Sequence, residues 1–279
     1  MGPIAALFAP LQATITRKNR EVGFDATHPW HHQLIVVESP DSLDVEYRGE
    51  YELWLDDGTT VTILEDLLRL LARAVVAPAL RSFTYRTEAV LAANGTYDYN
   101  IDPLVEGDRE FPNLTRLSLD GGEGEHGYKI LTSPLSGDDW TEAGVLARLL
   151  DKAPRLEDLA SPVPPGGSFF EGRPHPLRSL DVDAGFGHAD FIRQLAGCTR
   201  FPELRRLAFA EFRQTYLDDW RDRTTRFEDY LLFFGSPVAS GLESIRLREV
   251  DLTADQICRL LGMRSAGVEI SRRQAASNE

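Results

Sequence analysis

A short apolar unit recurs along this chain and restricts the fold more strongly than any other sequence feature. It has the form P-x-L-x-x-L-x-L, and its clearest copies run over residues 112–119 and 202–209, each directly after a phenylalanine. Weaker copies begin at Pro78, Pro154, Pro176 and Gly241, and residues 268–270 form a last fragment. Because the spacing inside the unit is constant, we expect stacked strand-containing units.

Amphipathic segments with helix-start signals lie between these units. Residues 62–65, 225–228 and 253–256 each have the form of a capping box, in which a threonine precedes a glutamate or glutamine by three positions. Further helices are predicted over residues 63–77, over 140–152 after Asp138 or Asp139, and over 190–196. Strands therefore alternate with helices.

Alternating strands and helices also fit a doubly wound sheet, whose strands are buried on both faces. The strands of the repeated unit instead alternate polar and apolar residues, as in Leu117-Ser-Leu119. One face of each strand must then meet solvent. The spacing favours a curved stack of strand–helix units over a doubly wound sheet.

The repeated unit resembles the leucine-rich-repeat family, over about residues 78–271. The resemblance implies an α/β solenoid with a parallel sheet on its concave face, of a bacterial cytoplasmic type. The asparagine or cysteine usual after the third apolar position is replaced by Asp120, Asp183 and Ala210. The first leucines fall at 80, 114, 156, 177, 204 and 242, so the steps are 34, 42, 21, 27 and 38 residues. We expect an irregular arc.

The first 77 residues lie outside the repeats. Alternation over residues 43–47 and 51–55, and the Asp57-Gly58 turn before residues 59–63, predict an antiparallel β-meander. Together with the helix over 63–77, this meander is predicted to cap the amino-terminal end of the sheet over residues 1–77. The repeats occupy residues 78–271, and residues 272–279 form a polar tail.

The net charge of −14 opposes binding to nucleic acid and to anionic membranes. We find no signal peptide and no apolar run long enough to span a membrane. Two cysteines, Cys198 and Cys258, are interpreted as buried helical thiols in a reducing cytoplasm. The bias of 27 arginines over 3 lysines is statistically typical of GC-rich bacterial genomes.

The two-residue period of a strand predicts which side chains face the open side of the sheet. The charged ones, which we take as the candidate binding residues, are Arg86, Arg116, Asp120, Asp158, Asp181, Asp183, Arg206, Arg246 and Arg248. Serines and a threonine accompany them at Ser82, Thr84, Ser118, Ser179 and Ser244. Carboxylates gather in the middle units and arginines toward the carboxyl end, an arrangement that would orient a charged partner.

Candidate sites for chemistry are few. The cluster His28, His31 and His32 could bind a transition metal, but a polar loop explains it equally well. The glycine-rich residues 121–127 lack the order of a phosphate-binding loop. No other catalytic motif is present, so we expect neither a metal nor a cofactor.

Two insertions carry aromatic residues, which often anchor protein interfaces. Residues 161–170 end in Phe169-Phe170, and residues 212–230 interleave aromatics with arginines. Either insertion could equally be part of the core.

These features favour a non-enzymatic, cytoplasmic protein-binding module. Its acidity suggests a basic protein partner, as for an immunity protein or an inhibitor that masks a basic toxin or enzyme. One alternative is an enzyme on an α/β scaffold, with His126, His188 and nearby carboxylates as its site. Another is an adaptor with several partners. The enzyme alternative predicts that both histidines meet in one pocket.

Overall fold

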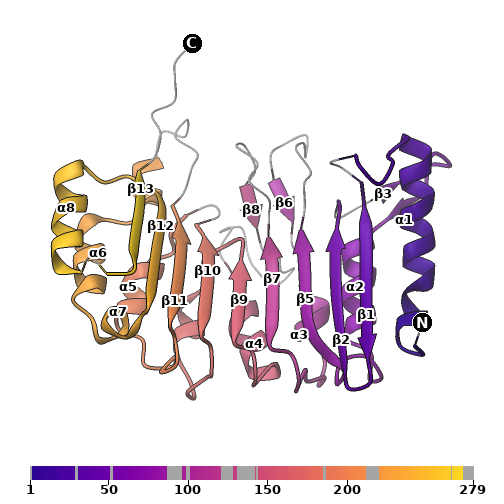
Figure 1. Ribbon diagram of the computed structural model, residues 1–279, viewed down its shortest axis with the longest axis horizontal. Coiled ribbons are helices and arrows are strands. Elements are labelled where there is room, and N and C mark those ends of the chain that lie inside the picture. The colour runs from indigo at the N-terminus through magenta and orange to yellow at the C-terminus, as the bar shows by residue number, and fades with distance from the viewer. Residues whose placement is uncertain are drawn as a thin grey trace, which may run out of the picture.

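The main feature of the fold is a nine-stranded, mostly parallel sheet (Figure 1). The computed structural model describes residues 2–28, 31–50, 53–86, 96–98, 101–120, 128–130, 142, 144–184, 187–211, 220–264 and 266–272. The strands of the sheet, in spatial order, are β1 (Gln33–Ser39), β2 (Ser42–Arg48), β5 (Leu80–Arg86), β7 (Arg116–Asp120), β9 (Asp158–Ser161), β10 (Ser179–Asp183), β11 (Arg206–Ala210), β12 (Ser244–Val250) and β13 (Val268–Arg272). Only the β1–β2 pair is antiparallel.

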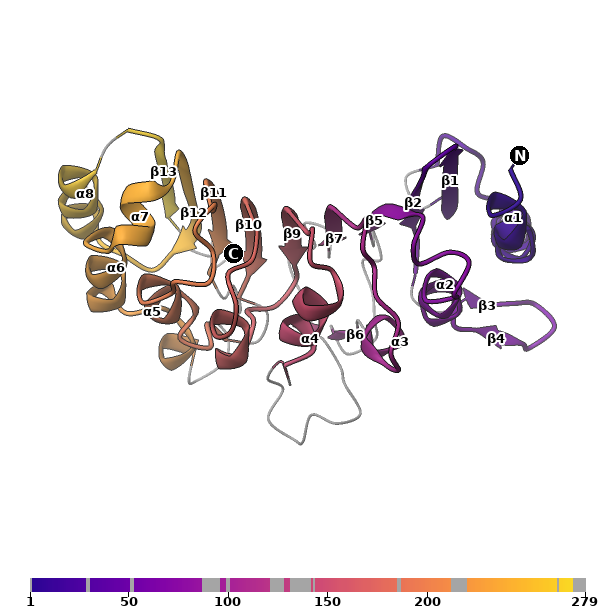
Figure 2. The same cartoon turned by 90° about the horizontal axis from the view of Figure 1, so that it is seen from below.

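Helices cover one face of this sheet. The helices in the described part of the chain are η1 (Ala5–Phe8), α1 (Ala9–Val22), α2 (Ile63–Leu71), α3 (Asp102–Val105), α4 (Val145–Lys152), η2 (Gly167–Phe170), α5 (Phe191–Ala196), η3 (Trp220–Arg223), α6 (Phe227–Phe234), α7 (Pro237–Gly241) and α8 (Ala254–Met263). Figure 2 shows α2 to α6 on the same side of the strands, while α1 stands beside β1. Two small strand pairs, β3 (Leu53–Trp54) with β4 (Thr60–Val61) and β6 (Thr96–Asp98) with β8 (Tyr128–Ile130), lie apart from the main sheet.

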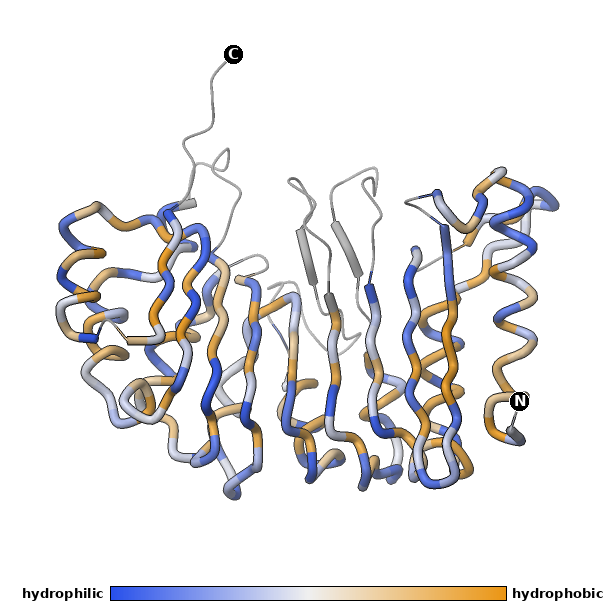
Figure 3. The backbone as a smooth tube through the Cα atoms, in the orientation of Figure 1, coloured by the Kyte–Doolittle hydropathy of each residue, from blue (hydrophilic) through white to orange (hydrophobic). Residues whose placement is uncertain are grey.

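The core lies between the sheet and the helices. Along each inner strand, residues alternate between buried apolar and more exposed polar side chains, as in β10, where Leu180 and Val182 are buried. Hydrophobic and hydrophilic colours accordingly alternate along the strands in Figure 3. The buried apolar residues of β2 through β12, apart from Ala210, belong to one continuous apolar cluster with the inward faces of the helices. The molecule is therefore a mixed α/β structure with one face of its sheet left free of described helices.

Consecutive units are joined by a recurring hydrogen-bond pattern at the start of the strands. Two successive amides of one unit donate to a single carbonyl of the preceding unit, at 2.7–3.1 Å. The donors and acceptors are Glu157 and Asp158 to Thr115, Arg178 and Ser179 to Glu157, Arg205 and Arg206 to Arg178, and Glu243 and Ser244 to Arg205. Each acceptor directly follows the first leucine of its repeated unit. The register between units is thus kept although the connecting segments differ in length.

The structure bears out one of the three predicted capping boxes. Thr253 accepts the amide of Gln256 at 3.2 Å, and Gln256 accepts the amide of Thr253 at 2.8 Å. The other two predictions were wrong. Thr62 precedes α2 without a side-chain cap. The amide of Thr225 donates to the carboxylate of Glu211, so α6 begins two residues later, after Arg226.

The amino-terminal region differs from the predicted meander. Residues 42–48 pair antiparallel with residues 33–39 and, on their other side, parallel with β5, so β2 belongs to the main sheet. Residues 51–63 contribute only the two-residue pair of β3 and β4. The helix α1 was not predicted, because only Ile15 and Asn19 within it are fully buried and its apolar period is weak.

Of the remaining predictions, the two helices are observed and one of the two thiol predictions is wrong. Residues 191–196 form α5 after Asp190, close to the predicted span. The helix predicted over 140–152 is seen as α4 from Val145, since 131–141 and 143 lie outside the described residues. Cys198 is a buried free thiol just after α5, but Cys258 is exposed on α8, which corrects the prediction that both are buried.

Candidate functional site

The outward-facing positions of strands β2 to β13 form three rows across the sheet, which we call the sheet face. In strand register, the first row is Asp44, Ser82, Arg116, Asp158, Ser179, Arg206 and Ser244; the second is Glu46, Thr84, Ser118, Ala160, Asp181, Ala208, Arg246 and Glu269; the third is Arg48, Arg86, Asp120, Asp183, Ala210 and Arg248. Every one of the nine residues predicted to bind a partner has its position in these rows. Strand periodicity thus assembles the predicted residues on one surface.

Two arginines converge on one carboxylate in the middle of the first row. Arg116 Nη2 lies 3.4 Å from Asp158 Oδ2, and Arg206 Nη2 donates to Asp158 Oδ1 at 3.0 Å. Arg206 reaches across β10, where Ser179 occupies the intervening position. A small residue at that position leaves room for the long arginine side chain to lie along the sheet.

Another arginine reaches across a strand to carboxylates of the second and third rows. Arg248 Nη2 on β12 donates to Asp181 Oδ1 at 2.8 Å and to Asp183 Oδ1 at 3.2 Å, both on β10. The strand between them presents Ala208 and Ala210. Although Ala210 points toward the helix-free side, it is only 1% exposed. The sheet face therefore has a floor of small residues crossed by extended arginines.

The two ends of the sheet face are also paired. At the carboxyl end, Arg246 Nε donates to Glu269 Oε2 at 2.8 Å. At the amino end, Arg81 and Ser82 donate to the carboxylate of Asp44. Partial burial raises the pKa of Asp44, but these hydrogen bonds outweigh it and hold the pKa below its usual value.

The charges on the sheet face nearly balance. By strand position it carries seven carboxylates and six arginines, a difference of −1, whereas the whole chain carries −14. The sequence predicted that carboxylates and arginines would occupy separate parts of the surface. Arginine side chains that cross a strand, above all Arg248, instead form ion pairs with the carboxylates of the middle units. The excess acidity of the chain therefore lies outside the sheet face. Arg86 is exposed and makes no ion pair with another described residue.

The histidines near the amino terminus make local contacts. His28 stacks on Phe24 with ring centroids 4.1 Å apart, and His31 Nδ1 lies 3.3 Å from the carbonyl of Phe24. His32 is buried, and burial, with the nearby charges of Lys18 and His31, lowers its pKa to about 4. Among the described residues, no three histidine, cysteine or acidic side chains are placed to hold a metal ion.

The residues of the enzyme alternative are only partly described. His126 and the glycine-rich residues 121–127 lie outside the described part of the chain. His188 Nδ1 accepts the amide of Asp190 at 3.1 Å and lies 3.9 Å from its carboxylate. This contact is local along the chain and defines no described pocket.

A buried carboxylate near His188 was missed by sequence reasoning. Glu211 follows β11, is 2% exposed, and accepts hydrogen bonds from the amide of Thr225 at 3.1 Å and from Tyr230 Oη at 2.6 Å. Burial raises its pKa despite these bonds. The contacts anchor the segment before α6 to the end of β11, which is a structural role that the sequence pattern did not signal.

The aromatic insertions prove to be core where the structure describes them. Phe169 and Phe170 are buried, which supports the core alternative for this insertion. Tyr230 is fully buried against Glu211, and Phe227 is half-buried beneath Arg259. Residues 212–219 lie outside the described residues.

Comparisons of this chain with protein-family models, with curated proteins and with solved structures give no match. Within the described ranges, every helix is too short or too polar to cross a membrane.

Proposed function

We propose that this protein is a non-enzymatic binding module that uses the sheet face to hold another protein. The observation that carries the proposal is the sheet face itself, three polar rows across the main sheet that no described helix covers. The opposite face of the same strands is packed against helices. A broad, regular and accessible surface of this kind suits a macromolecule better than a small substrate.

We further propose that the chain is an irregular leucine-rich-repeat solenoid. The shared-carbonyl contacts support this assignment, because the four successive junctions from β7–β9 to β11–β12 are bonded in the same way. The curvature supports it too. In Figure 2 both ends of the sheet turn toward the helix-free side, so the sheet face lies on the inside of the curve.

The side-chain arrangement suits protein binding for an energetic reason. Arginines that already lie along the surface in ion pairs lose less conformational freedom on association than free ones, which cost about 0.5–1.5 kcal/mol each to immobilise. In the second row, the small residues Ala160, Ala208 and Ser118 project less from the sheet than the arginines do. A partner can then contact both the arginine planes and the floor between them.

We propose a basic protein as the partner, as an immunity protein or an inhibitor would require. Since the excess negative charge lies off the sheet face, we assign it a long-range role in raising the association rate. The sheet face would then supply the fit. In an adaptor role, several partners would bind the sheet face, and a substitution there would abolish the binding of all of them.

The test is affinity capture from the source cell at low and moderate salt with two matched variants. Asp181→Arg/Asp183→Arg reverses two charges on the sheet face. Asp66→Arg/Asp255→Arg makes the same change in net charge on exposed positions of α2 and α8. The proposal predicts a stoichiometric basic partner that the face variant loses and the helix variant retains.

Two outcomes would contradict the proposal. If both variants lose the partner equally, net charge alone drives association and the sheet face is not the interface. If the face variant keeps the partner, binding occurs elsewhere on the molecule. Failure to capture any protein, followed by conversion of a metabolite, would favour the enzyme alternative.

A further inference from the structure

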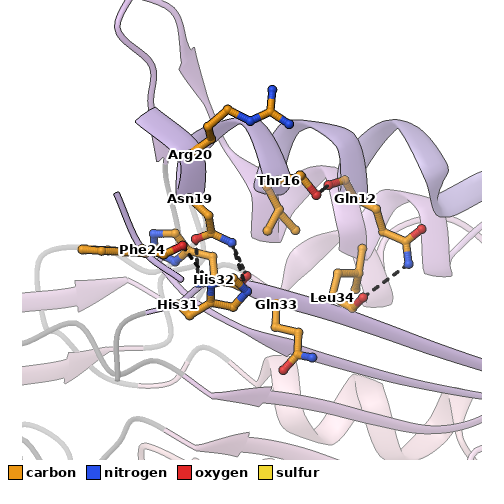
Figure 4. Close-up of a pocket in the computed structure, with 10 residues that line it drawn as sticks. Gln12, Thr16, Asn19, Arg20, Phe24, His31, His32, Gln33 and Leu34 are labelled. Atoms are coloured by element: carbon orange, nitrogen blue, oxygen red, sulfur yellow. Dashed lines mark hydrogen bonds between the residues drawn. The ribbon is translucent and has the colours of Figure 1, made fainter. Parts of the chain in front are cut away.

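A cavity lies between α1 and the edge strand β1 (Figure 4). Its volume is about 580 Å³, within the range of small-molecule sites. Two polar contacts bridge the helix and the strand. Asn19 exchanges hydrogen bonds with the backbone of His32 at 2.7 and 3.0 Å, and Gln12 Nε2 donates to the carbonyl of Leu34 at 3.3 Å. These contacts replace part of what a neighbouring strand would provide.

The edge of β1 directs a backbone donor toward this cavity. In an antiparallel pair, alternate residues direct both backbone groups away from the partner strand. The bonds of His32 and Leu34 to α1 place these residues in the outward-directed set. The amide of Leu34 therefore points toward α1 and away from β2. A ligand oxygen at this position could accept that hydrogen bond.

The charge around the cavity favours an anion. None of its ten lining residues is acidic, in a chain with 44 carboxylates, whereas Arg20 and His31 both line it. In Figure 4 the Arg20 side chain extends from the last turns of α1 with its guanidinium directed away from the labelled residues of β1, so it would have to turn inward to meet a ligand. The low pKa of His32, to which burial contributes most and the charges of Lys18 and His31 add, is consistent with a positive local potential.

The cavity also has apolar walls. The buried Ile15 of α1 lines the cavity, as do Phe24, which follows α1, and Leu34 of β1. An occupant with only charged surface, such as inorganic phosphate, would leave these walls without contact. The combination of an amide donor, a cationic rim and an apolar wall matches a molecule with one carboxylate and a short hydrocarbon body.

We propose that the cavity between α1 and β1 binds a small organic monocarboxylate. One carboxylate oxygen accepts the Leu34 amide, Arg20 supplies the countercharge at the rim, and the hydrocarbon part packs against Ile15 and Phe24. The site is separate from the sheet face, so its occupancy can be measured whether or not a protein partner is found.

The test is titration of the full chain with butyrate, with its neutral counterpart butyramide, and with inorganic phosphate, followed by amide NMR shifts and calorimetry. We expect saturable shifts of the Leu34 and His31 amides with butyrate only. Arg20→Gln should weaken butyrate binding about fivefold, the effect of about 1 kcal/mol. Arg69→Gln, an exposed arginine on α2, is the matched control and should leave binding unchanged. Thr16→Tyr, which places a ring at the cavity wall, should abolish it.

Three results would overturn the proposal. Equal shifts with butyramide would show that the carboxylate is not recognised. Shifts with phosphate but not butyrate would indicate a simple anion site. Unchanged butyrate binding in both Arg20→Gln and Thr16→Tyr would place the binding outside this cavity.

Discussion

The guanidinium of Arg248 donates to the carboxylate of Asp181 at 2.8 Å, although the whole of β11 separates their strands. Two strand spacings amount to about 10 Å, so the arginine must lie nearly flat along the sheet. It can do so because β11 presents alanines at the positions in between. The identity of one strand's small residues therefore fixes the surface formed by its two neighbours.

Enlarging the alanine beneath Arg248 should remove this arrangement. In Ala210→Leu the added side chain would occupy the space under the guanidinium and break both ion pairs. We expect a loss of about 1–3 kcal/mol in the free energy of unfolding, measured by urea denaturation. Ala160→Leu, on the same face but away from any crossing arginine, should cost less than about 0.5 kcal/mol. Equal losses in both variants would argue against a special role for the small floor.

Removing the threonine of the confirmed capping box should destabilise the protein more than removing Thr62, which makes no cap. Thr253→Ala removes the acceptor of the Gln256 amide and should cost about 1 kcal/mol in urea denaturation. Thr62→Ala removes a side chain that makes no cap bond and should change the unfolding free energy little. A larger effect at Thr62 would mean that the α2 start is capped in solution.

Acidification should weaken the contact between α1 and β1 through His32. The pKa of His32 is about 4 in the folded protein and about 6.5 when unfolded, so the unfolded state binds the extra proton between these values. The stability that depends on neutral His32 is fully present above pH 6.5 and is lost as the pH falls toward 4. Denaturant titrations at pH 7.5, 5.5 and 4.5 should show a shallower decline for His32→Gln. An identical decline in both proteins would contradict this assignment.

Glu211 should produce the opposite pH dependence. Since burial raises its folded pKa above the usual 4.5, stability is lost as the pH rises from 4.5 through the raised value. Glu211→Gln should remove that loss, so the difference in unfolding free energy between the two proteins should vary with pH in this window. Tyr230→Phe, which deletes the 2.6 Å hydrogen bond, should move the loss to higher pH. A pH-independent difference for Glu211→Gln would show that Glu211 stays ionised throughout.

Short-range periodicity predicted the strands and the membership of the sheet face. The spacing in residues 112–119 and 202–209 places leucines inward and polar side chains outward, and β7 and β11 form there as expected. This succeeds because the two-residue period of a strand needs no knowledge of its neighbours.

Long-range contacts escaped prediction. The pairing of β2 with both β1 and β5 depends on which strands meet in space, and the meander prediction considered only neighbours in sequence. The ion pairs of Arg206 and Arg248 depend on a small residue contributed by a third strand. The buried Glu211 likewise satisfies groups fourteen and nineteen residues away, which no local pattern signals.

The carbonyls that each accept two amides from the next unit have a mechanical consequence. These backbone bonds join only adjacent units, and on the described sheet face only the ion pairs of Arg206 and Arg248 reach over one strand. Under a pulling force on the two ends of the chain, the junctions should therefore break one after another. We expect extension in discrete steps, each releasing a segment as long as the interval between two leucines. The first step should come from β13, whose Val268 and Ile270 are only partly buried, while β1 remains held by α1.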